Sequence, residues 1–74
     1  MWKEGSIKIH NSVFHYWVKV YDEPSPYGID GGKVSKLQLT REGMTVCNYD
    51  RGWDQEPEDP DTQLAVAILL HDNN

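Results

Sequence analysis

The chain has 74 residues, 38% hydrophobic and 11% aromatic, so we expect a single folded domain spanning residues 1–74 with a core near the lower size limit for independent stability. A formal net charge of −5 opposes any phosphate-rich partner. The first residues lack the apolar run of a signal peptide, and no stretch approaches the roughly 20 apolar residues of a membrane span. Cys47 is the single cysteine and has no disulfide partner. A cytoplasmic location is therefore expected.

The N-terminal part predicts a β-hairpin. Ser6–His10 alternates, with Ile7 and Ile9 on one side, and Asn11-Ser12 is the expected turn. Val13–Tyr21 is rich in β-branched and aromatic residues, which is typical of a strand. Its predicted core face holds Phe14, Tyr16, Val18 and Val20. Its opposite face holds His15, Trp17, Lys19 and Tyr21.

A second hairpin is expected after a loop at Asp22–Gly32, which is rich in proline and glycine. The third strand is predicted at Lys33–Arg41 and the fourth at Met44–Asp50, joined by a tight Glu42-Gly43 turn. The side chains expected to face the core are Leu37 and Leu39 on the third strand and Met44 and Val46 on the fourth.

The C-terminal part predicts an acidic connector, Arg51–Glu58, and then a helix, Asp59–His71. Asp59 is suited to cap the helix and Pro60 to begin it. The layout is therefore β-β-β-β-α. We expect an α+β fold, a four-stranded antiparallel sheet with one C-terminal helix packed on one face.

The helix is apolar on all sides between Leu64 and Leu70, and such helices are usually buried all round. Four residues share the face expected to meet the sheet: Leu64, Ala65, Ile68 and Leu69. Val66 and Leu70 would point away from the sheet and form a homodimer interface. The alternative is that Val66 and Leu70 tuck under a loop or the Trp2 segment.

The sequence offers no pattern typical of catalysis. The glycines around Tyr27–Gly32 do not make a phosphate loop, because such a loop needs Gly-Lys-Ser/Thr opening a helix and here a strand is expected to follow. His10, His15 and His71 lack zinc-ligand spacing. We therefore expect a protein without enzymatic activity, metal or cofactor.

Two surfaces could bind a partner. The acidic one comprises Asp54, Glu56 and Glu58, the carboxylates before the helix that capping does not explain. The other is the outer sheet face, where aromatic and basic side chains alternate as on sheets that bind single strands. Its expected members are Lys8, His10, His15, Trp17, Lys19, Tyr21 and Lys36. An ordinary solvated loop and an ordinary exposed sheet face are the alternatives.

Three segments resemble a family of short uncharacterised proteins of Firmicutes, their phages and mobile elements. The segments are Phe14–Asp22, Tyr27–Ser35 and Asn48–Trp53, the last with the run Asn-Tyr-Asp-Arg-Gly-Trp-Asp. The strand layout is similar to the PC4-like single-stranded-DNA-binding fold, which implies dimerisation through the helix. The run Gly-Trp-Asp-Gln-Glu-Pro-Glu-Asp resembles an acidic segment of phage anti-CRISPR inhibitors, which implies occupation of a nucleic-acid channel.

Two functions follow as expectations. The first is a small interaction protein of phage or mobile-element type whose acidic connector engages a basic protein surface, with inhibition of a host CRISPR-type machine as one form of that contact. The alternative is a PC4-like module that binds single-stranded nucleic acid on the outer sheet face. The net charge favours the first, and the segregated lysines keep the second open.

Overall fold

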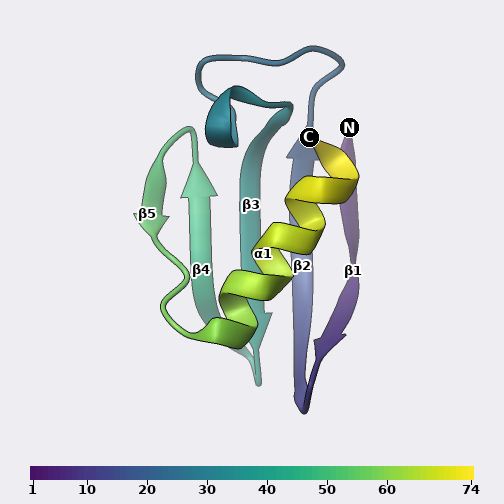
Figure 1. The fold of residues 1–74 in the computed structure, drawn as a ribbon, viewed down its shortest axis with the longest axis vertical. Helices are drawn as coiled ribbons and strands as arrows, with labels where there is room; N and C mark the ends of the chain where they lie inside the picture. Colours follow the sequence, from purple (N-terminus) through teal and green to yellow (C-terminus); the bar gives the residue numbers. More distant parts are fainter.

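The computed structural model describes all 74 residues and contains one antiparallel sheet covered by one helix (Figure 1). The strands are β1 (Trp2–Ile9), β2 (Ser12–Val20), β3 (Val34–Arg41), β4 (Met44–Asp50) and β5 (Trp53–Gln55). They lie side by side in chain order. The helix α1 (Pro60–Asn73) crosses one face, and a short 3₁₀ turn, Ile29–Gly31, lies in the loop before β3. The predicted α+β class is confirmed, with five strands instead of four.

The first hairpin extends further than the sequence indicated. β1 begins at Trp2, because Trp2 and Glu4 pair with Lys19 and Trp17 of β2. Ile9 pairs with Ser12, so the two-residue turn is at His10 and Asn11, one residue earlier than predicted. His10 adopts a positive φ of 54° there. Phe14 and Val18 are fully buried, which confirms the core face of the second strand.

In the second hairpin β4 has the predicted bounds, Met44–Asp50, and β3 begins at Val34, one residue later than predicted. The turn is also as predicted, since Glu42 and Gly43 both have positive φ, as a type I′ turn requires. Of the two inward residues predicted for β4, Val46 packs partly buried against the core, but Met44 does not, and the buried pair was missed. Leu39 pairs with Cys47 but Thr40 pairs with Thr45, so a bulge shifts the alternation. As a result Cys47 and Tyr49 are buried, Val46 is half-buried and Met44 is 71% exposed.

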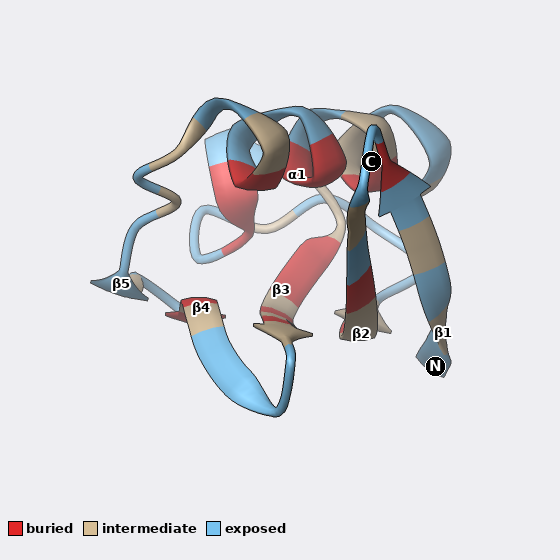
Figure 2. Ribbon diagram, turned by 90° about the horizontal axis from the view of Figure 1, so that it is seen from below, coloured by how far each residue is buried: buried red, intermediate tan, exposed pale blue.

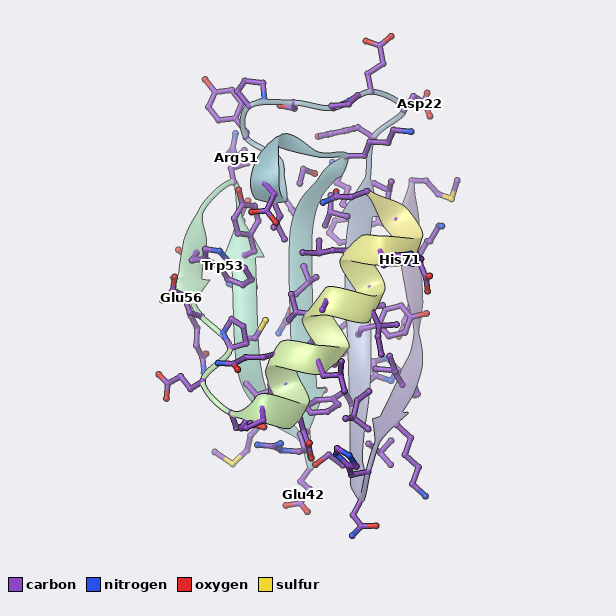
Figure 3. The ribbon with its side chains drawn as sticks, viewed as in Figure 1. Asp22, Glu42, Arg51, Trp53, Glu56 and His71 are labelled. Carbon is purple, nitrogen blue, oxygen red and sulfur yellow. The ribbon has the colours of Figure 1, made fainter.

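The expected connector contains a short edge strand, β5, which the sequence did not predict. Tyr49 of β4 pairs with Trp53, and the two rings meet edge to face with centroids 5.0 Å apart. Figure 3 shows the Trp53 side chain directed from β5 over β4. The large ring therefore attaches this segment to the sheet. A strand of three residues is too short to produce a periodic signal in the sequence.

The helix begins as predicted, since the Asp59 carboxylate accepts from the Thr62 backbone N–H at 3.1 Å and Pro60 occupies the first turn. Figure 2 shows its buried stripe turned toward the sheet. The buried residues are Thr62, Ala65, Val66 and Leu69. Their spacing is that of one helical face.

The predicted orientation of the helix was wrong for two residues. Val66 is only 6% exposed and belongs to the core, whereas Leu64 is 45% exposed. The Thr62 hydroxyl donates to the Asp59 carboxylate that caps the helix, and Thr62 is therefore part of the buried stripe. With Thr62 included, the buried face of α1 is rotated by about one residue from the predicted face. No helix of the protein is both long and apolar enough to cross a membrane.

Candidate functional site

The face of the sheet opposite α1 has no covering element, as the view along the strands shows (Figure 2). We call it the open face. Strand alternation and the cross-strand pairs place on it side chains from four strands. These are Trp2, Glu4 and Lys8 of β1, His15, Trp17 and Lys19 of β2, Lys36 and Gln38 of β3, and Asn48 and Asp50 of β4. Five of the predicted outer-face residues therefore share one surface: Lys8, His15, Trp17, Lys19 and Lys36.

Lys19 lies among aromatic rings near one end of the open face. Its Nζ is 5.8 Å from the centroid of Trp2 and 5.2 Å from that of Tyr21. Tyr21, also predicted for this face, is 46% exposed just beyond β2. The Lys19 ammonium favours the ionised phenolate and so lowers the pKa of Tyr21 from its ordinary value. Trp2 was not among the predicted residues, because no strand was expected before Ser6.

Lys19 also lies directly opposite Lys36 across β2 and β3. Like charges in directly opposed positions repel one another. Lys36 has a carboxylate within reach, Asp50, with Nζ and Oδ1 3.8 Å apart, and Arg51 approaches the same oxygen at 3.7 Å. Lys19 has no carboxylate within ion-pair distance, and its ammonium lies near the rings of Trp2 and Tyr21. The open face thus carries positive charge that an anion could neutralise.

His15, Lys8 and His10 lie apart from the group formed by Lys19, Lys36, Trp2 and Tyr21 or have other partners. His15 Nε2 is 2.8 Å from Glu4 Oε2, and its ring lies 4.3 Å from the Trp17 centroid. Lys8 lies opposite Val13 near the turn, away from Lys19. His10 was predicted for the outer face, and this is wrong: its Nδ1 is 2.8 Å from Asp61 Oδ1 at the start of α1. The left-handed turn at His10 redirects its side chain toward the helix.

A shallow pocket of about 200 Å³ is open on this face. It is lined by Trp2, Trp17, Lys36, Gln38, Asn48 and Asp50, together with the core residues Leu37 and Tyr49. The two indoles come from β1 and β2, and the polar groups come from β3 and β4. The pocket therefore has an aromatic side and a polar side, and the sequence could not reveal it because Trp2 and the bulge in β4 were not foreseen.

The predicted acidic surface is divided. Asp54 accepts from Asn48 Nδ2 at 3.2 Å, so it borders the open face. Glu56 lies at the β5 edge (Figure 3), and Glu56 and Glu58 are exposed without an ion-pair partner. The two other acids of this segment serve the fold, as expected for positions at a helix start. Asp59 pairs with Arg41 at 3.1 Å, and Asp61 accepts from Ser12 as well as contacting His10.

The remaining predicted site concerned the helix. Val66 is buried within its own chain, so it is unavailable to a partner helix, and Leu70 is half-buried against the core. The large apolar side chain that α1 does expose is Leu64. A homodimer through α1 stays a prediction, with Leu64 in place of Val66 at its centre.

The side chains of this protein do not form a metal-binding group or an activated nucleophile. No three His, Cys, Asp or Glu side chains gather into a group that could hold a metal ion. Cys47 is fully buried, and burial raises the pKa of its thiol to about 12. A thiol held protonated in this way is a poor nucleophile.

Comparison with known proteins gives a family but no activity. No curated protein and no solved structure matches the chain. One family matches residues 1–74, the full length, and it is described as a domain of unknown function, DUF7678. The chain belongs to the DUF7678 family.

Proposed function

We propose that this protein is a non-enzymatic binding module whose open face binds single-stranded nucleic acid. The observation that carries the proposal is the opposed pair Lys19 and Lys36, which lies beside Trp2 of β1 and Trp17 of β2 on the same face. Surfaces that bind single strands combine cations that contact phosphates with exposed aromatic rings on which bases stack. Cations and aromatic rings are both present here on one face of the sheet.

The distribution of charge supports the proposal despite the net charge of −5. Most acidic side chains lie in loops, in the segment before α1 or in α1 itself. These are Asp22, Glu23, Asp30, Glu42, Glu56, Glu58, Asp59, Asp61 and Asp72. The carboxylates on or beside the open face, Glu4, Asp50 and Asp54, each lie within contact distance of a donor or cation. Lys19 is left without an acidic partner.

A second candidate is contact between the acidic connector and a basic protein, such as a nucleic-acid-handling machine of a host defence system. It is favoured by the exposure of Glu56 and Glu58 without internal partners. It has less support than the open face, because Asp54, Asp59 and Asp61 are hydrogen-bonded within the chain. Carboxylates that already accept hydrogen bonds within the chain have fewer free acceptor sites for the cations of a partner protein.

Fluorescence anisotropy with a labelled single-stranded oligonucleotide, repeated over a salt series, tests the proposal. The parent should bind with an affinity that falls as salt rises. Changing Lys19 and Lys36 together to Gln should weaken binding and reduce the log–log salt slope by about 0.7 for each phosphate that is no longer neutralised. Trp17→Ala should remove a stacking surface that is worth roughly 1–3 kcal/mol for each base.

Lys3→Gln is the matched control. Lys3 is an exposed lysine of β1, but its Nζ donates to Asn73 Oδ1 of α1, so it lies on the helix side. It should leave the affinity and the salt slope close to those of the parent. Equal losses from Lys3→Gln and the Lys19, Lys36 variant, or no salt-dependent binding by the parent, would remove the open face as the binding surface.

A further inference from the structure

We infer that the pocket on the open face holds one unstacked guanine base of the bound strand. This inference rests on the proposed function and deepens it, because it makes the module selective for strands that contain guanine. It uses the six open-face residues of the pocket: Trp2, Trp17, Lys36, Gln38, Asn48 and Asp50.

The size of the pocket limits its occupant. Its volume of about 200 Å³ is below the 300–1,000 Å³ that is usual for sites of drug-sized molecules. A single heterocycle suits that space, with its sugar and phosphate remaining outside. Trp2 and Trp17 line the side formed by β1 and β2, so a planar ring can lie against indole.

The polar side of the pocket is rich in hydrogen-bond acceptors. Gln38 Nε2 donates to Thr45 Oγ1 and Asn48 Nδ2 donates to Asp54 Oδ2, both at 3.2 Å, which orients each amide and leaves its carbonyl oxygen available. The Asp50 carboxylate accepts no side-chain hydrogen bond, since its nearest cations are at 3.7 and 3.8 Å. An ionised carboxylate can accept two parallel donors at once.

Guanine matches this arrangement better than the other bases. It presents the ring N1–H beside the exocyclic N2 amino group, two adjacent donors that a carboxylate can accept together. Its O6 and N7 are acceptors, which lysine recognises, and Lys36 lies beside Asp50. Adenine, cytosine and thymine do not offer two adjacent donor groups on one edge. Asp50 is therefore assigned as the residue that selects the base.

A cationic ligand would also suit indole rings and a carboxylate. Three cations surround the site, however: Lys36 and Arg51 at Asp50, and Lys19 over Trp2. Their repulsion opposes a further positive charge, whereas it does not oppose a neutral base attached to an anionic backbone. The charge around the pocket thus favours a base.

The test compares four single-stranded oligonucleotides made of thymidines, which differ in one central base: thymine, adenine, hypoxanthine or guanine. Hypoxanthine is guanine without the N2 amino group. The parent should bind the guanine strand at least about five-fold more tightly than the thymine strand. Hypoxanthine should lose most of that preference.

Asp50→Asn should abolish the guanine preference while binding of the all-thymine strand persists, which also shows that the variant is folded. Glu4→Gln is the control, because Glu4 is a carboxylate of the same face that does not line the pocket. It should keep the preference.

Each outcome has a separate meaning. Equal binding of all four strands by the parent, or a guanine preference that survives in Asp50→Asn, would overturn this inference and leave the proposed function in place. Failure of the parent to bind any of the strands would instead overturn the proposed function.

Discussion

Asp59 connects three parts of the molecule through one carboxylate. It caps α1 through the backbone and hydroxyl of Thr62, and it receives two bonds from Arg41 at 3.1 and 3.3 Å. The Arg41 guanidinium in turn lies 5.3 Å from the centroid of Phe14 in the core. The capping role was evident from the sequence, because Asp before Pro is a local signal. The Arg41 partner was not, since it is 18 residues distant.

This arrangement predicts a specific loss of stability in acid. Hydrogen bonds from Thr62 and Arg41 lower the pKa of Asp59 from 3.8 to about 2. A carboxyl group whose pKa is lower in the folded chain stabilises the fold above its ordinary pKa, and this contribution disappears as the pH falls from about 4 toward 2. Urea unfolding between pH 7 and 2 measures the effect.

Asp59→Asn is the matched comparison, because asparagine also caps helices but cannot ionise. At pH 7 the variant should be less stable by roughly 1 kcal/mol, the scale of a partly exposed ion pair. The difference between parent and variant should shrink between pH 4 and 2. A difference that stays constant over this range would show that the Asp59 charge contributes nothing.

At the scale of elements, the sequence predicted what depends on local periodicity and turn chemistry. The helix, the turn at Glu42-Gly43 and the bounds of β4 belong to this group. It could not predict the bulge at Val46, which depends on how β3 and β4 pair, and it could not predict β5, which depends on the contact between Trp53 and Tyr49. Of the candidate site, it indicated the lysines and Trp17 but not Trp2 or the pocket.

The attachment of β5 gives a second prediction. Trp53 is half-buried and covers Tyr49, whose hydroxyl donates to the Tyr27 carbonyl at 2.9 Å. Trp53→Ala should therefore reduce the free energy of unfolding by about 2–3 kcal/mol, somewhat below the value for a fully buried tryptophan. Trp53→Phe should recover most of that loss. An unchanged melting temperature in Trp53→Ala would mean that β5 is held by its backbone bonds alone.

The rotation of α1 gives a third prediction. Val66 is buried and Leu64 is 45% exposed. Val66→Ala should destabilise the fold by roughly 1–3 kcal/mol, whereas Leu64→Ala should cost less than about 0.5 kcal/mol, as exposed changes usually do. Chemical denaturation of both variants distinguishes this helix orientation from the one that the sequence favoured. In the orientation that the sequence favoured, the larger loss of stability would occur in Leu64→Ala.

Leu64 also tests self-association through the helix. If α1 pairs with a second copy, Leu64→Asp should shift the protein from dimer to monomer in light scattering, because a charge would then be buried at the interface. The melting temperature of the monomeric variant shows whether its fold is retained. A parent that is monomeric at high micromolar concentration contradicts helix-mediated dimerisation.

At the scale of the whole molecule, the two sides of the sheet differ in charge. Lys8, Lys19 and Lys36 lie on the open face together with Glu4 and Asp50, while Asp59, Asp61 and Asp72 lie at or within α1 on the other side. Such a distribution orients the protein as it approaches a charged partner. A polyanion is attracted by the lysines of the open face and repelled by the carboxylates elsewhere, and the balance depends on how far each charge acts through the solvent.

This dependence distinguishes the two candidate functions with one variant. Changing Glu56 and Glu58 together to Gln removes two exposed charges without internal ion pairs, and it should alter the free energy of unfolding by less than about 0.5 kcal/mol. If the open face binds nucleic acid, the loss of this distant repulsion should raise the affinity for a single strand. The increase should be evident at about 0.01 M salt, where the screening length is about 30 Å, and nearly absent at 0.15 M, where it is about 8 Å. If the acidic connector is instead the contact surface for a basic protein, the same variant should bind that protein more slowly and leave the affinity for the strand unchanged even at low salt.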